Sequence, residues 1–152
     1  MAGSAGLDLI NDIVKLINDN WTSGGGKRPT VTKIWNTKEV GLADNKAERI
    51  IVMLDAETPH IFGLKYTDGD GHNAYDWMHD VSLSIDVWTG ISEDRVLDMV
   101  NEVTRILKRN VLLTVGTHGY VQMLPTGITS LNEQYRNMYR YMIDIEVKKF
   151  NP

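Results

Sequence analysis

Residues 79–89 read HDVSLSIDVWT and alternate between apolar and polar side chains. Such alternation is typical of a β-strand that packs one face on the core and turns the other face to solvent. Residues 139–147 read YRYMIDIEV and repeat this pattern over a similar length. Because two amphipathic strands of matching length pair most simply side by side, we predict that these segments are neighbours in an antiparallel sheet.

Two further segments have the three-to-four-residue spacing of an amphipathic helix. One is 7–21, and the other is 92–110, which begins with Ser92, a good N-cap. Lys108 and Arg109 stand at the end of the second segment, where positive charge suits the helix dipole. We therefore predict an α+β fold, with a mainly antiparallel sheet and two principal amphipathic helices packed on it. The second helix is expected to cover the apolar face of the two strands.

Shorter strands and loops are predicted for the remainder of the chain. The strands are expected at 30–35, 49–55, 111–115 and 120–124. We expect the strand at 49–55 to be covered on both faces, because it is uniformly aliphatic, and to end before Pro59. Glycine and small polar residues predict mobile loops near 22–29, 63–77 and 116–130. The second of these is either a long exposed loop or the tip of an extended hairpin. A single domain spanning 1–152 is expected at this length.

Composition excludes several classes of protein. The chain has no cysteine, which rules out disulfides, thiolate zinc sites and a cysteine nucleophile. Its 16 basic and 20 acidic residues give a formal net charge of −4, which disfavours a dedicated nucleic-acid binder. The longest aliphatic run, Ile50 to Leu54, is far shorter than the roughly 20 residues that cross a bilayer. The N-terminus also lacks the apolar core of a signal peptide, so we expect synthesis in the cytoplasm and no membrane partner.

Sequence motifs for catalysis are absent or incomplete. The stretch GDGHNA at 69–74 has the glycine spacing of a dinucleotide fingerprint, but Asp68 and Asp70 would repel a pyrophosphate. The chain also lacks a G-x-S-x-G nucleophile motif. We therefore predict no catalytic residue, no cofactor and no metal ligand. A function of another class stays open: a small metal- or ligand-binding enzyme centred on Asp68, Asp70, Asp76 and His79.

Aromatic residues on polar or mobile stretches indicate assembly with other proteins. Tyr66, Tyr75 and Trp77 surround the longest predicted loop, and Trp88 lies on the polar side of its strand. Met142 interrupts an otherwise charged strand face. Exposed apolar side chains that gather in this way mark surface that another protein covers. We predict that these five residues contribute to an interface and that the protein assembles rather than catalyses.

The order of the predicted elements resembles that of the tail terminator or tail-completion proteins of long-tailed bacteriophages, the minor tail protein U-like family. The resemblance in sequence detail lies in 79–89, which runs into the helix beginning at Ser92, and in 139–147. As an order of elements it covers most of the chain: helix, glycine-rich break, strands, long loop, strand, helix and closing strand.

The resemblance implies a structural virion protein that forms a ring, commonly a hexamer, at the head-proximal end of the tail tube. There such a protein ends tube growth and joins the tail to the head connector. Its partners are then copies of itself, the tail tube protein and the connector or neck protein, and genomic DNA passes through the ring without specific binding. A subunit of a closed ring uses a different patch toward each neighbour. A head-closure or neck adaptor, which binds the portal side instead, is the alternative within this class.

Overall fold

The computed structural model describes residues 5–33, 48–67, 69–71, 73–110, 114–115, 118–132 and 138–150. Helix α1 (Ala5–Asn20) is followed by a short 3-10 turn, η1 (Ser23–Gly25), and helix α2 (Glu93–Arg109) lies in the middle of the chain. The strands are β1 (Thr30–Thr32), β2 (Glu48–Thr67), β3 (Asn73–Thr89), β4 (Thr114–Val115), β5 (His118–Ser130) and β6 (Tyr139–Phe150). Neither helix of the described residues is long and apolar enough to cross a membrane.

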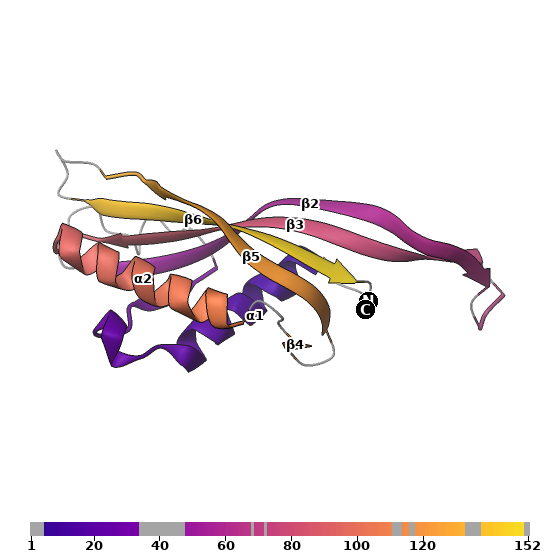
Figure 1. Cartoon of the computed structure of the whole chain (residues 1–152), viewed down its shortest axis with the longest axis horizontal. Coiled ribbons are helices and arrows are strands. Elements are labelled where there is room, and N and C mark those ends of the chain that lie inside the picture. The colour runs from indigo at the N-terminus through magenta and orange to yellow at the C-terminus, as the bar shows by residue number, and fades with distance from the viewer. Residues whose placement is uncertain are drawn as a thin grey trace.

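The strands form a sheet in the order β1-β2-β3-β6-β5-β4. Only β1 and β2 are parallel, and every other neighbouring pair is antiparallel. The predicted pairing of the two amphipathic strands is confirmed, because β3 and β6 are antiparallel neighbours with Ile85 opposite Ile143. Both helices lie on the same face of the sheet (Figure 1). The predicted α+β class is therefore confirmed.

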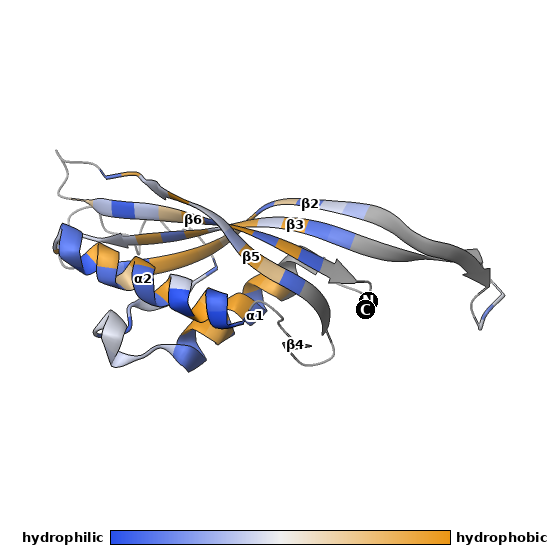
Figure 2. Cartoon of the chain, viewed as in Figure 1, coloured by the Kyte–Doolittle hydropathy of each residue, from blue (hydrophilic) through white to orange (hydrophobic). Residues whose placement is uncertain are grey.

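The face of the sheet beneath the helices forms the hydrophobic core. The four apolar residues of β3 that face it are at most 1% exposed: Val81, Leu83, Ile85 and Val87. All six predicted apolar positions of α2 are buried against this face: Val96, Met99, Val100, Val103, Ile106 and Leu107. Hydrophobic and hydrophilic residues alternate along α2 as an amphipathic helix requires (Figure 2). The Ser92 hydroxyl accepts a hydrogen bond from the Arg95 amide at 3.1 Å, so the predicted N-cap is also confirmed.

For 63–77 the hairpin alternative is the correct one, because β2 continues to Thr67 and β3 begins at Asn73. The loop predicted near 116–130 is wrong from residue 118 onward. β5 runs from His118 to Ser130 and includes the strand predicted at 120–124. The predicted strands at 30–35 and 111–115 correspond to β1 and β4. β1 ends at Thr32, so the prediction is wrong at Lys33, and residues 34–35 and 111–113 lie outside the described part.

Pro59 does not end β2 as predicted, because it occupies an edge of the sheet. It pairs with His79 of β3, while β1 pairs with β2 only as far as Ile51. Beyond that point β2 has no second neighbour among the described residues, and an edge strand tolerates a residue without an N–H group. Pro125 is tolerated within β5 for the same reason. Among the described residues, β4 pairs with β5 only at His118 and Gly119, so Pro125 also lies on an edge.

The β2–β3 hairpin extends past the rest of the sheet (Figure 1). β6 pairs with β3 only as far as Met78, so residues 60–67 and 73–77 form a ribbon of two strands. We call these residues the arm. Gly71 in its turn has a φ of 84°, a left-handed conformation that glycine adopts without strain. Two strands without a further layer are only marginally stable in water, so the arm gains stability from any surface that packs against it.

Candidate assembly surface

The sheet face opposite the helices, which we call the outer face, carries a buried ion pair. Asp86 of β3 is fully buried and accepts hydrogen bonds from Arg140 of β6. The Arg140 Nε lies 2.8 and 2.9 Å from the two carboxylate oxygens, and Nη2 lies 2.7 Å from Oδ2. A carboxylate is buried at reasonable cost only when it is paired in this way. The alternating pattern predicts solvent on this side of β3, and at Asp86 that prediction is wrong.

A row of carboxylates continues along the outer face next to this pair. Ser84, also buried, donates a hydrogen bond to Asp55 of β2 and lies 3.4 Å from the Asp144 carboxylate of β6. Ser82 donates to Glu146 at 2.9 Å. Ser84 therefore lies between carboxylates of the strands on both sides, and Ser82 binds one carboxylate of β6. The result is a surface of negative character that is ordered by hydrogen bonds.

Trp88 is not on the surface, which corrects the exposure predicted for it. It is 2% exposed and packs with Ile51 in a second, smaller apolar cluster on the outer face, against which Met53 also packs. In the sheet, Arg49 of β2 and Arg140 of β6 lie opposite it. Trp88 therefore contributes to the stability of the sheet.

The other four predicted interface residues lie on two different parts of the sheet. Tyr66, Tyr75 and Trp77 belong to the arm by their backbone, and their side chains lie outside the described part of the structure. Met142 of β6 is half-buried and has Asp86 on one side and Thr129 of β5 on the other. The structure thus gathers three of the residues on the arm and places Met142 one strand from the β5 edge.

The alternative metal site receives no support from the residues that the structure describes. Asp70 is exposed in the turn of the arm, whereas His79 is half-buried and its Nδ1 lies 3.0 Å from the Glu57 carboxylate. Asp68 and the side chain of Asp76 are outside the described part. Among the described side chains, no group of three or more could hold a metal ion.

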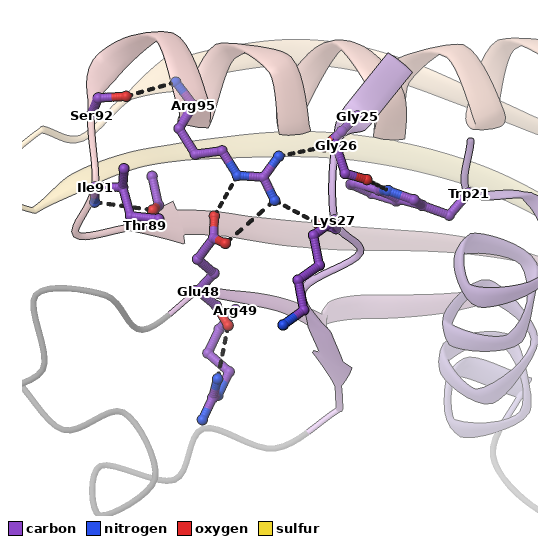
Figure 3. Close-up of polar contacts among 10 residues, drawn as sticks. All are labelled: Trp21, Gly25, Gly26, Lys27, Glu48, Arg49, Thr89, Ile91, Ser92 and Arg95. Carbon is purple, nitrogen blue, oxygen red and sulfur yellow. Dashed lines mark hydrogen bonds and ion pairs between the residues drawn. The ribbon is translucent and has the colours of Figure 1, made fainter. Parts of the chain in front are cut away.

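On the helix side, Arg95 ties three segments together (Figure 3). Its guanidinium binds Glu48 at the start of β2, with the Arg95 Nε 2.6 Å from the carboxylate, and donates to the carbonyl groups of Gly25 and Lys27. Gly26 between them has a φ of 69°, which a side chain would strain. These bonds connect the loop predicted near 22–29 to α2 and β2. That this loop is mobile stays a prediction.

Glu102 of α2 forms a second connection to the end of α1. Its carboxylate accepts hydrogen bonds from the amide and hydroxyl of Thr22, at 2.7 and 2.8 Å, and from Arg105 at 2.6 Å. The bond from Arg105 is the main reason why the pKa of Glu102 is lowered to about 2, with the bonds from Thr22 acting in the same direction. Glu102 is therefore a buried structural anion.

The β5 edge carries exposed apolar side chains that the sequence analysis overlooked. Leu124 and Ile128 are 39% and 50% exposed. β5 contains one histidine but no aspartate, glutamate, lysine or arginine from His118 to Ser130. Edge strands of monomeric proteins usually carry charge that prevents pairing with other chains. The uncharged run was visible in the sequence, but its significance depends on β5 being an edge, which the sequence did not reveal.

Comparison with known proteins finds a solved structure with a similar fold but no matching family. No protein-family model matches the chain, and no curated protein matches its sequence. A solved structure described as "Virion of native gene transfer agent (GTA) particle" contains a chain with a similar fold, with a TM-score of 0.60. The similarity covers 98% of this chain and 100% of the other, at 13% sequence identity. At that identity the likeness shows a shared fold.

Proposed function

We propose that this protein is a structural component of a phage-like particle, and that it forms a ring at the head-proximal end of the tail tube. In that position it ends tube growth and joins the tail to the head connector. The observation that carries the proposal is the similarity of fold, over nearly the whole chain, to a protein of a virion. The resemblance of 79–89 and 139–147 to tail terminators supports the position in the particle. The role is structural and involves no reaction.

The arm supports this proposal because it projects beyond the rest of the sheet and can contact a neighbouring protein. It extends beyond the sheet as two strands whose outer edges both lack a partner strand in the described structure. Tyr66, Tyr75 and Trp77 lie along it, and aromatic residues are enriched where proteins meet. In our proposal the arm contacts the last ring of the tube, and Met142 contributes to the contact with an adjacent copy.

The outer face suits a channel that conducts DNA. Asp55, Asp144 and Glu146 give it negative character, and the whole chain has a formal net charge of −4. Phosphates are repelled by such a surface, so DNA passes without being retained. We propose that this face is turned toward the channel, while the helices lie on the outside of the ring.

A tube-growth assay tests the function. The tail tube protein of the same virus is polymerised with and without this protein, and tube lengths and ends are recorded by negative-stain electron microscopy. We expect shorter tubes with a ring at one end. A matched variant replaces 63–75 with an Asn-Gly turn between the paired residues Phe62 and Asp76, which shortens the arm but keeps the sheet. It should form rings that no longer stop growth.

Two outcomes contradict the assignment. Tubes of unchanged length and uncapped ends show that the protein does not terminate the tube. Binding to purified DNA-filled heads, with no effect on tubes, identifies the head-closure or neck adaptor instead.

A further inference from the structure

The sheet has two free edges that lie on opposite sides of the molecule. β1 covers β2 only as far as Ile51, and β4 covers β5 only at His118 and Gly119. The backbone of β2 from Val52 onward and of β5 from Tyr120 onward therefore lacks a second neighbour in the described structure. Free N–H and C=O groups of this kind are a template for pairing with another strand.

Strand direction makes the two edges complementary. Three antiparallel steps separate β2 from β5 in the order β2-β3-β6-β5, so the two edge strands run in opposite directions. A copy of the chain rotated about an axis along the strands presents its β2 to the β5 of the first copy. The two strands then meet antiparallel, and the sheet continues from one copy into the next. Such a head-to-tail contact is the type that closes rings.

The two edges also match in height and in side-chain chemistry. Register across the sheet puts Ile128 level with Ile143, Ile85 and Val52, which is the first residue of β2 that β1 leaves free. Next to it on β2 are Met53 and Leu54, both only partly buried.

Apolar side chains are thus available on both faces of each edge. On β5, Ile128 lies on the helix side and Leu124 on the outer side, opposite Glu146. On β2, Leu54 pairs with Leu83 on the helix side and Met53 pairs with Ser84 on the outer side. Contact between the edges would cover apolar surface on each face of the joined sheet.

We infer that the β5 edge of one copy pairs antiparallel with the β2 edge of the next, so that a sheet runs continuously around the ring. The occupant of each edge is a second copy of this chain. This inference rests on the ring of the proposed function and names the surfaces that form it. Ile128, Leu124, Met53 and Leu54 are the side chains at the junction.

Cross-linking tests the junction directly, because the chain has no cysteine of its own. Two single-cysteine variants, Ala56→Cys on β2 and Thr126→Cys on β5, both change exposed residues. They are mixed in equal amounts and treated with a short bismaleimide. We expect the mixture to yield at least fivefold more cross-linked dimer than either variant alone. The control mixture pairs Ala56→Cys with Asn101→Cys on the exposed side of α2, and should yield only background.

A matched pair of substitutions gives an independent readout. Ile128 and Ile91 are almost equally exposed, at 50% and 52%, but only Ile128 lies on the β5 edge. Ile128→Asp should raise the concentration needed for half-assembly at least tenfold in mass photometry. Ile91→Asp should leave it unchanged. Circular dichroism should show both variants folded, because neither side chain is part of the core.

The outcomes separate the inference from the proposed function. Rings that form normally but give no cross-link above the control, and that tolerate Ile128→Asp, overturn the β5–β2 junction and leave the ring intact. A chain that stays monomeric at every concentration overturns both the ring and the junction.

Discussion

Ile85 and Asp86 are consecutive residues of β3, and both are fully buried, yet they are buried by different means. Ile85 packs under the helices among other aliphatic side chains. Asp86 lies on the outer face and is held by the two-pronged contact of Arg140. Burial of Ile85 is therefore a matter of apolar area, whereas burial of Asp86 depends on one specific partner.

The difference predicts how the two faces respond to change. Apolar packing is shared among many neighbours, so the loss of one contact is partly absorbed by the others. The neighbours of a buried carboxylate cannot compensate in this way, because removal of its cationic partner leaves an unpaired charge in the interior. A single substitution at Arg140 should therefore destabilise the outer face strongly.

The largest expected effect follows from Arg140→Met. This change leaves Asp86 buried without its cation and should lower the free energy of unfolding by about 3–5 kcal/mol. Urea denaturation followed by circular dichroism measures the loss. Lys148→Met is the matched control, since Lys148 lies on the same strand and face but is exposed, and its effect should stay within about 0.5 kcal/mol.

A double variant sharpens the comparison of the two faces. Asp86→Val combined with Arg140→Met replaces the pair with apolar side chains and should recover more than half of the loss. Recovery would show that the single variant fails because of the isolated charge. If Arg140→Met alone costs less than about 1 kcal/mol, the outer face does not depend on the pair.

Glu102 extends the comparison to the helix side, where a paired carboxylate is also buried. Its pKa is about 2 in the folded protein, against an ordinary value of 4.5, because Arg105 and Thr22 donate to the ionised form. A lowered pKa stabilises the folded state above about pH 4.5, and the stabilisation is lost as the pH falls toward 2. Between pH 6 and pH 3 the wild-type protein should lose about 1–2 kcal/mol more stability than Glu102→Gln.

Urea denaturation at the two pH values measures this difference, with Glu146→Gln as the control. Glu146 is exposed on the outer face. Parallel losses in the wild type and in Glu102→Gln would show that Glu102 does not anchor α1 to α2.

Alternation was sufficient to predict the helix side of the molecule from the sequence. The apolar positions of 79–89 and 139–147 identified the two central strands and their pairing, and the stripe of 92–110 identified the helix that covers them. The same pattern gave no information on the outer face. Asp86 read as solvent-facing because a carboxylate is buried only when a distant partner, here Arg140, pairs with it. Trp88 read as solvent-facing because the apolar cluster that buries it is formed with Ile51 of another strand. Both contacts join residues that are far apart in the sequence, so they are set by the tertiary structure.

The continuation of β2 past Pro59 and the β5 edge were missed for a related reason. Proline predicts the end of a strand on the assumption that the strand has neighbours on both sides, because it has no N–H group to donate to one of them. Pro59 and Pro125 lie on edges that no other described strand covers, and there that assumption fails. Of the predicted interface residues, the sequence indicated Tyr66, Tyr75 and Trp77 by their spacing around the turn, but it did not indicate that Ile128 lies exposed on an edge.

The smallest expected effect is that of Trp88→Phe, which tests whether the outer cluster is held by apolar contact alone. The Trp88 indole N–H is buried and has no hydrogen-bond acceptor in the described structure, which sets it apart from the paired Asp86 on the same strand. Trp88→Phe removes this donor at the cost of some packing volume, so the two effects offset each other and stability should change by less than about 1 kcal/mol. Trp88→Ser removes the packing as well and should cost about 3–5 kcal/mol. Equal losses from the two substitutions, measured by urea denaturation, would mean that the N–H group does bind an acceptor and that the outer cluster, like the ion pair, depends on a specific partner.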